Sequence, residues 1–146
     1  MAASVNVHAT AVARGGRAVL IRGAPGSGKS DLALRLLALA VSPLNPAPFA
    51  LVADDQVLLK RNGEQILAHC PPPIAGLIEV RGVGLRKVPH TAEAVVALVV
   101  DLVPREQVER LPAQPSTVRL LDAEMPQVSL CALDASTPAK IALLLG

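Results

Sequence analysis

The sequence is poor in aromatic residues, and this scarcity limits how the protein could recognise its partners. Phe49 is the only aromatic residue among 146, and the chain has no Trp and no Tyr. Proteins that hold single-stranded nucleic acid usually stack its bases on aromatic side chains. Lys and Arg number 14 against 12 Asp and Glu, which leaves a net charge of only +2. We therefore expect no nucleic-acid partner, because a stacking platform and a strongly basic surface are both missing.

Long apolar runs and clustered cysteines are also missing. The longest apolar run covers residues 94–100, far short of the roughly 20 residues that a membrane-spanning helix needs. The first residues show no basic start followed by an apolar stretch, so we expect no signal peptide. Cys70 and Cys131 have no neighbours at metal-ligand spacing, which favours reduced thiols in a cytoplasmic protein. We expect a cytoplasmic protein without a membrane partner.

Apolar residues make up 51% of the chain, enough for the core of a single domain over residues 1–146. Asn62-Gly63 between apolar runs predicts a hairpin, and a strand–loop–helix unit begins at residue 17. This combination favours an α/β class, a mixed sheet with flanking helices. Strands are predicted at 5–14, 17–21, 49–53, 56–60, 64–69, 77–80, 94–103, 117–121 and 127–133, helices at 29–41 and 137–145, and one or two helical turns at 105–111.

Residues 23–30, GAPGSGKS, fit the phosphate-loop (P-loop) pattern G-x-x-x-x-G-K-[ST] between a predicted strand and a predicted helix. Gly26 and Gly28 have no Cβ, so the backbone can turn its N–H groups toward a phosphate. The helix N-terminus adds partial positive charge. Lys29 suits the β- and γ-phosphates of a nucleotide, and Ser30 offers a hydroxyl to Mg²⁺. The predicted phosphate-binding residues are Gly23, Ala24, Pro25, Gly26, Ser27, Gly28, Lys29 and Ser30.

Two places offer a carboxylate at the end of an apolar strand: Asp54 with Asp55, and Asp101. Adjacent carboxylates repel each other unless a cation or a shared proton lies between them, and they would point to opposite sides if the strand continued. We interpret Asp101 as a strand end that faces solvent. A carboxylate near a phosphoryl donor can accept the proton of an attacking hydroxyl. The pair therefore favours transfer to a hydroxyl acceptor over hydrolysis.

Four segments in this order resemble the catalytic domain of HPr kinase/phosphorylase, the bacterial enzyme that acts on a serine of the carrier protein HPr. They are VNVHATAV, the P-loop, LVADDQV and LIEVRGVGL, and the resemblance covers roughly residues 5–90. LIEVRGVGL resembles the family's signature segment and is more specific than the P-loop, which many folds share. The resemblance implies the short form of the family, which consists of the C-terminal catalytic P-loop domain. It also implies a fold similar to that of phosphoenolpyruvate carboxykinase.

The resemblance implies an ATP-dependent, Mg²⁺-dependent protein-serine kinase. Asp54 would take the proton from the carrier's serine and return it in the reverse reaction. His8 would sit beside Asp54 and tune it, and the segment from residue 78 to residue 87 would belong to the catalytic site. The implied catalytic residues are Asp54, His8, Lys29 and Arg81, and the implied Mg²⁺ ligands are Ser30, Glu79 and Asp55.

The implied partner is an HPr-like phosphocarrier protein, and the implied assembly is a homo-oligomer, a hexamer as in the family. Three features depart from the family pattern. Pro25 stands where the family usually has serine, a proline-rich insertion precedes Asp54, and no arginine after residue 90 aligns with the family's later catalytic arginine. Phosphorolysis, the reverse reaction, is therefore left open. A different P-loop kinase or NTPase and a nucleotide-sensing module remain the alternatives.

Overall fold

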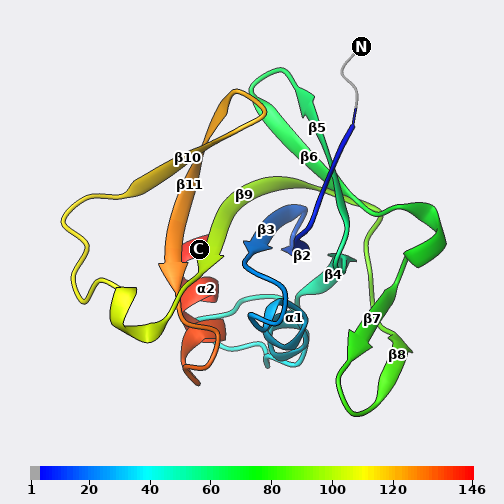
Figure 1. Ribbon diagram of the computed structural model, residues 1–146, viewed down its shortest axis with the longest axis horizontal. Coiled ribbons are helices and arrows are strands. Elements are labelled where there is room, and N and C mark those ends of the chain that lie inside the picture. The colour runs from blue at the N-terminus through cyan, green and yellow to red at the C-terminus, as the bar shows by residue number, and fades with distance from the viewer. Residues whose placement is uncertain (1–3) are drawn as a thin grey trace.

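The alternating apolar segments pair into a large curled sheet, which Figure 1 shows arching over the two α-helices. The computed structural model describes residues 4–146. The strands are β1 (Val5–Val7), β2 (Thr10–Arg14), β3 (Arg17–Arg22), β4 (Ala50–Ala53), β5 (Val57–Asn62), β6 (Gln65–His69), β7 (Leu77–Val80), β8 (Gly84–Lys87), β9 (Glu93–Leu102), β10 (Ser116–Leu120) and β11 (Ala123–Leu130). The helices are α1 (Lys29–Leu37) and α2 (Thr137–Leu145), with single 3-10 turns at Pro72–Ile74 and Arg105–Gln107.

The main sheet is mixed, as the sequence predicted. Its described strands follow the order β1-β5-β6-β9-β3-β2-β4, and β11 joins β9 with β10 outside it. Strand β9 pairs in parallel with β3 and β11 and antiparallel with β6. Because β3 holds one edge of β9, the other edge is shared, with β6 on its first residues and β11 on its last. Figure 1 shows the sheet curled, with β9 as its long curved strand.

The position of β2 decides which loops meet. Strand β2 is antiparallel to both β3 and β4, so β3 and β4 run in the same direction and end at the same edge of the sheet. The first residue of β2, Thr10, lies at that edge opposite Ile21, and Ala11 lies opposite Ala53. The P-loop, which follows β3, and the acid pair, which follows β4, are therefore neighbours in space.

Strict alternation along the central strands gives the sheet two apolar faces. Ala18 and Leu20 of β3 belong to an apolar cluster with residues of β2, β4, β5, β6 and β9. Val19 and Ile21 point the other way and pack with Leu32 of α1. All these side chains are fully buried. Short aliphatic residues thus fill both layers, which is how a chain with a single aromatic residue still forms a core.

Helix α1 ends at Leu37, earlier than the predicted residue 41. The side chain of Asn45, which is buried, donates to the backbone carbonyl oxygens of Leu39 and Ala40, and its own Oδ1 accepts from Arg14 Nη1 at 2.8 Å. These carbonyls are therefore bonded to a loop residue instead of to the next helical turn. The prediction that the helix continued through residue 41 was wrong, although its start at Lys29 was confirmed.

Two strand predictions also need correction. The predicted strand over residues 5–14 is broken at His8 and Ala9, because β1 pairs with β5 while β2 pairs with β3 and β4. The β5–β6 hairpin is confirmed, but the paired residues Asn62 and Gln65 leave Gly63 and Glu64 as its turn. At 105–111 the helical part is only the single 3-10 turn.

Strands β7 and β8 form a separate two-stranded hairpin that projects at the lower right of Figure 1. Of its residues 77–87, all of which the structure describes, Ile78 alone is fully buried, and it joins the apolar cluster that contains α1. The four residues of β8 are exposed. Ile78 is therefore the fully buried anchor of the hairpin, and the partly buried Val80 packs against the same cluster.

Replacing this anchor should destabilise the fold. We expect Ile78→Ala to lower the free energy of unfolding by about 2–5 kcal/mol, because a buried side chain is removed and a cavity remains. Leu85→Ala on the same hairpin, where the side chain is 63% exposed, should change it by less than about 0.5 kcal/mol. Urea denaturation followed by circular dichroism measures both. Equal effects of the two changes would contradict the anchoring role.

Candidate functional site

The P-loop crosses from the end of β3 to the start of α1 in a conformation that requires glycine. Gly26 and Gly28 have φ angles of 79° and 98°, in the left-handed region that residues with a Cβ rarely adopt. The backbone N–H of Ser27 donates to the carbonyl oxygen of Ala24 at 3.0 Å and closes the turn. A Cβ on Gly23 would overlap the Ser27 hydroxyl. The loop that the sequence pattern predicted is therefore formed locally.

The positive groups of the loop converge at its mouth. The ammonium group of Lys29 donates to the carbonyl oxygens of Gly23 and Ala24, at 2.9 and 3.2 Å. Helix α1 begins at Lys29 with no side-chain cap, so its first N–H groups remain available to an anion. Pro25 lies in the exposed part of the turn. A phosphate at this mouth would meet one full positive charge and several backbone donors.

The carboxylate of Asp54 joins three elements. The hydroxyl of Ser30, in the first turn of α1, donates to Asp54 Oδ1 at 2.6 Å. Thr10 Oγ1 donates to the same oxygen at 3.0 Å, and the backbone N–H of Glu79 donates to Asp54 Oδ2 at 3.0 Å. Asp54 is only 6% exposed, and three donors compensate the burial of its charge. The P-loop helix, β2 and the β7–β8 hairpin thus meet at this carboxylate.

Asp55 points elsewhere, because strand β4 ends at Ala53. Its φ of 67° is left-handed, and the side chain is 69% exposed. Its oxygen Oδ1 lies 3.9 Å from Nδ1 of His8, whose side chain is 85% exposed. The two adjacent carboxylates therefore diverge, one buried against Ser30 and one open to solvent beside His8.

The oxygen atoms around Asp54 suit a hard divalent cation. Ser30 Oγ and the Asp54 carboxylate are in contact, and Glu79, whose side chain is exposed, lines the same cleft as Asp54 and Asp55. Across residues 4–146, no three side chains of His, Cys, Asp or Glu gather as a complete metal cage. Mg²⁺ usually takes one or two carboxylates and completes its shell with water and phosphate oxygens. The donor set therefore fits Mg²⁺ that arrives with a nucleotide.

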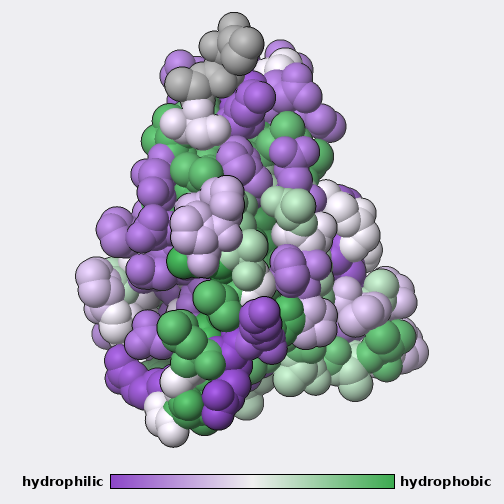
Figure 2. Space-filling model, turned by 90° about the vertical axis from the view of Figure 1, so that its right-hand side faces the viewer, coloured by the Kyte–Doolittle hydropathy of each residue, from purple (hydrophilic) through white to green (hydrophobic). Residues whose placement is uncertain are grey.

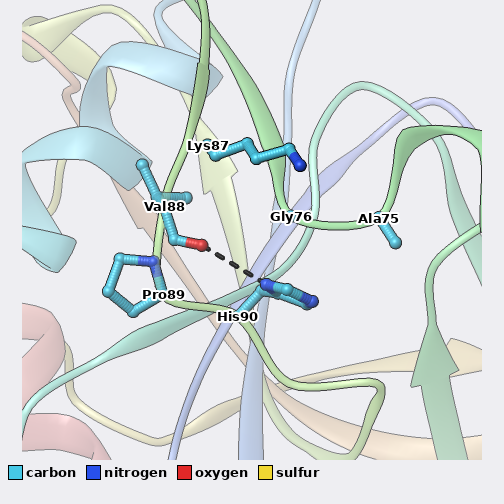
Figure 3. A pocket seen from close by; sticks show the side chains of 6 residues that line it. All are labelled: Ala75, Gly76, Lys87, Val88, Pro89 and His90. Atoms are coloured by element: carbon cyan, nitrogen blue, oxygen red, sulfur yellow. Dashed lines mark hydrogen bonds between the residues drawn. The ribbon is translucent and has the colours of Figure 1, made fainter.

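The acid pair opens into a cleft of about 160 Å³ whose other walls are partly apolar. Its apolar lining comes from Ile74, Leu77 and Leu85. A larger hollow of about 370 Å³ lies at the base of the hairpin, where Nδ1 of His90 is 3.3 Å from the Val88 carbonyl oxygen (Figure 3). None of the predicted catalytic, phosphate-binding or metal-binding residues lines this hollow, whereas Asp54, Asp55 and Glu79 line the smaller cleft. Chemistry rather than size identifies the smaller cleft as the site.

The structure does not bring every predicted residue to this cleft. Arg81 lies in the exposed turn between β7 and β8, and no hydrogen bond or ion pair holds it within the part of the chain that is described. It does not line the cleft of the acid pair. A catalytic role for Arg81 would require a movement of the hairpin, or a bound substrate, that brings its guanidinium group to the acid pair.

The interpretation of Asp101 as a solvent-facing strand end was wrong. Arg22, the last residue of β3, donates from Nε and Nη2 to the two oxygens of Asp101, at 2.8 and 3.0 Å. Gln127 Nε2 also donates to Asp101 Oδ2, at 2.8 Å. Burial would raise the pKa of Asp101, but the hydrogen bonds from Arg22 and Gln127 and the charge of Arg22 hold it below its usual range. The pair ties β3 to β9 directly before the P-loop.

Sequence reasoning missed Thr10 and Arg22. Thr10 is a polar residue within a run of small apolar ones, and Arg22 directly precedes the P-loop. Neither stands at a motif position. Their partners, Asp54 and Asp101, are 44 and 79 positions away, so only the strand pairing reveals them.

Comparison with known proteins shows which protein family the chain resembles along most of its length. The family described as HPr Serine kinase C-terminal domain matches residues 1–142. The HPr kinase/phosphorylase of Geobacillus kaustophilus is 34% identical over 89% of this chain and 43% of its own length. That of Bordetella pertussis is 33% identical with the same coverage. The chain thus spans less than half the length of these relatives. The family match extends to residue 142, so the expectation that the resemblance covers only about residues 5–90 was wrong.

A solved structure agrees with the fold. The Hpr(Ser) kinase/phosphatase from Coxiella burnetii superposes with a TM-score of 0.78 and 26% sequence identity, covering 96% of this chain and 93% of that one. The expected mixed α/β fold is confirmed by this likeness. Neither α-helix in the described residues is long and apolar enough to cross a membrane.

The Arg22–Asp101 pair predicts a dependence of stability on pH. Because the pKa of Asp101 is lower in the folded protein than in the unfolded chain, the pair stabilises the fold above the ordinary carboxyl range. This stabilisation is lost as the pH falls through the lowered folded-state pKa. Asp101→Asn should therefore be less stable than wild type at neutral pH, and the difference should shrink in acid.

Urea unfolding over a series of pH values measures this difference. Glu109→Gln, which changes an exposed carboxylate, is the matched control and should follow wild type throughout. A difference between Asp101→Asn and wild type that stays constant down to the acid limit would refute the ion-pair account.

Proposed function

This chain belongs to the family of HPr serine kinase C-terminal domains, and we propose that it phosphorylates a serine of an HPr-like phosphocarrier protein with ATP and Mg²⁺. Residues 1–146 would act as a single catalytic domain. One observation carries the proposal. The 2.6 Å bond between Ser30 and Asp54 ties the phosphate cradle to an acid pair whose second member, Asp55, is exposed. A phosphoryl donor and an acceptor hydroxyl could then meet at one edge of the sheet.

The contacts support a division of labour between the two carboxylates that reverses the roles implied by the resemblance. Asp54 is buried and already bonded to Ser30, which suits the side that holds Mg²⁺ rather than the side that receives a protein. Asp55 is exposed and next to His8, which suits a base that must reach a serine on another molecule. We therefore assign the metal side to Ser30 and Asp54, with Glu79 nearby, and the base to Asp55.

In this assignment the transfer proceeds as a displacement at phosphorus. The serine hydroxyl of the carrier gives its proton to Asp55 as its oxygen bonds the γ-phosphorus, and the bond to the leaving ADP breaks. Lys29 and the N–H groups of the P-loop offset the charge on the phosphate oxygens. His8 would orient the Asp55 carboxylate. Bound Mg²⁺ would neutralise part of the phosphate charge.

The surface near the acids favours a protein acceptor over a metabolite. The cleft is small and opens beside Leu85 of β8, which is 63% exposed, and Val83 in the neighbouring turn is 53% exposed. Figure 2 shows apolar side chains low on this face of the molecule, mixed with polar ones. Exposed apolar side chains next to a site are typical of surfaces that receive another protein. A site for a small acceptor would instead be a concave pocket that encloses most of the acceptor molecule.

Several expectations stay predictions. They are the hexameric assembly, the reverse phosphorolysis, the cytoplasmic location, a contribution of Arg81 to catalysis, and the lack of nucleic-acid and membrane partners. Light scattering after gel filtration would measure the assembly, and incubation of phosphorylated carrier with inorganic phosphate would measure phosphorolysis.

The first test is phosphorylation of a carrier. Incubation of a purified HPr-like protein with this protein, ATP and Mg²⁺ should add one phosphoryl group, seen by intact mass. Lys29→Ala should lose the transfer because the P-loop loses its full positive charge, while Lys60→Ala on β5 should keep it. If ATP binds tightly and no acceptor is modified, the sensor alternative is favoured. Phosphorylation of a metabolite alone would favour another P-loop kinase.

A second test separates the two carboxylates. We expect Asp55→Asn to lower turnover by roughly 10²–10⁴-fold, the usual contribution of a general base, with the affinity for Mg²⁺–ATP retained. Asp54→Asn should instead raise the Mg²⁺ concentration needed for half-maximal activity. Titration calorimetry and initial rates at several Mg²⁺ concentrations distinguish these outcomes. The opposite pattern would restore Asp54 as the base.

A further inference from the structure

The hydroxyl of Thr10 makes two hydrogen bonds, one with each member of the acid pair. It is the first residue of β2 and is fully buried, next to the buried side chains of Ala9 and Ala11. The hydroxyl donates to Asp54 Oδ1 at 3.0 Å and accepts from the backbone N–H of Asp55 at 3.3 Å. A buried hydroxyl requires hydrogen-bond partners. Here the two partners belong to two consecutive acids, Asp54 and Asp55.

The backbone at Asp55 needs such support. The N–H of Gln56 donates to the carbonyl oxygen of Asp54 at 2.8 Å, which closes a three-residue turn centred on Asp55. Asp55 has a φ of 67°, and turns of this size with a positive φ at the centre are rare and strained. Strained backbone persists only where its surroundings over-determine it. The Thr10 hydroxyl binds the central N–H of this turn.

We propose that Thr10 is a positioning residue that keeps the two consecutive carboxylates in separate roles. Its donated bond holds the Asp54 carboxylate where Ser30 reaches it. Its accepted bond fixes the left-handed turn that directs the Asp55 side chain outward to His8 and the acceptor. The inference rests on the proposed kinase function, because in that function Asp54 binds the metal and Asp55 acts as the base.

Loss of the hydroxyl should act on the chemistry more than on binding. Without it, the Asp55 N–H loses its partner and the turn can relax to a negative φ, which redirects the Asp55 side chain. Lys29 and the P-loop are held by their own contacts, and Asp54 keeps its bonds from Ser30 and from the Glu79 N–H, so Mg²⁺–ATP should bind as before. A base displaced by about an ångström can cost on the order of 10²-fold in rate.

The test compares Thr10→Val, which keeps the branched shape and removes the hydroxyl, with Thr10→Ser, which keeps the hydroxyl and removes a methyl group. Thr10→Val should lower kcat for carrier phosphorylation by roughly 10–100-fold, with the ATP affinity and the carrier KM unchanged. Thr10→Ser should recover most of the lost kcat. Thr117→Val, on exposed β10, is the matched control for the Thr-to-Val change and should retain wild-type kcat.

Two outcomes would overturn the inference. One is a kcat of Thr10→Val equal to that of wild type. The other is that Thr10→Val and Thr10→Ser lose kcat equally, and in proportion to their loss of thermal stability. Thr10 would then be only a packing residue.

A crystal structure of Thr10→Val provides a readout without activity. Asp55 should leave the left-handed conformation, while Ser30 and the P-loop stay in place. An unchanged Asp55 backbone would also overturn the inference. If wild type itself transfers no phosphoryl group to a carrier, the proposed function fails, and the conformation of Asp55 in the variant still decides what Thr10 does.

Discussion

The hydrogen bond between Ser30 and Asp54 is the contact on which the rest of the site depends. It joins the first turn of α1 to the end of β4, across 24 positions of sequence, at 2.6 Å. Because Ser30 follows the P-loop directly, this bond sets the distance between the phosphate cradle and the acids. The sheet makes the bond possible, since β2 lies between β3 and β4 and brings both of their ends to one edge.

The β7–β8 hairpin contributes both a backbone donor and cleft-lining side chains to the site. It carries the segment that resembles the family signature, yet its nearest contact with the acids is the N–H of Glu79, which donates to Asp54 Oδ2 at 3.0 Å. Ile78 anchors the hairpin on the inner side, Arg81 is exposed in the turn, and Leu85, although 63% exposed, lines the cleft of the acid pair. The hairpin thus holds the buried carboxylate with one face and offers the other to a partner.

Local signals predicted the local structure well. Glycines at fixed positions, a strand before them and a helical pattern after them were sufficient for the P-loop, and compact apolar runs located β4 and β9. The sequence was less informative wherever a distant partner decides. Asn45 binds the backbone carbonyls that follow α1, Arg22 pairs with Asp101, and Thr10 bonds to both members of the acid pair. None of these contacts follows from spacing, because each depends on which strands pair in the folded sheet.

The central claim is that Asp54 serves the metal and Asp55 serves the acceptor. The most direct measurement is a crystal structure of this protein with Mg²⁺ and a non-hydrolysable ATP analogue. The account predicts the triphosphate on the P-loop beside Lys29, the metal bound by Ser30 and Asp54, and the Asp55 carboxylate unligated beside the γ-phosphate. A metal held by Asp55 and Glu79, with Asp54 facing the γ-phosphate, would contradict it.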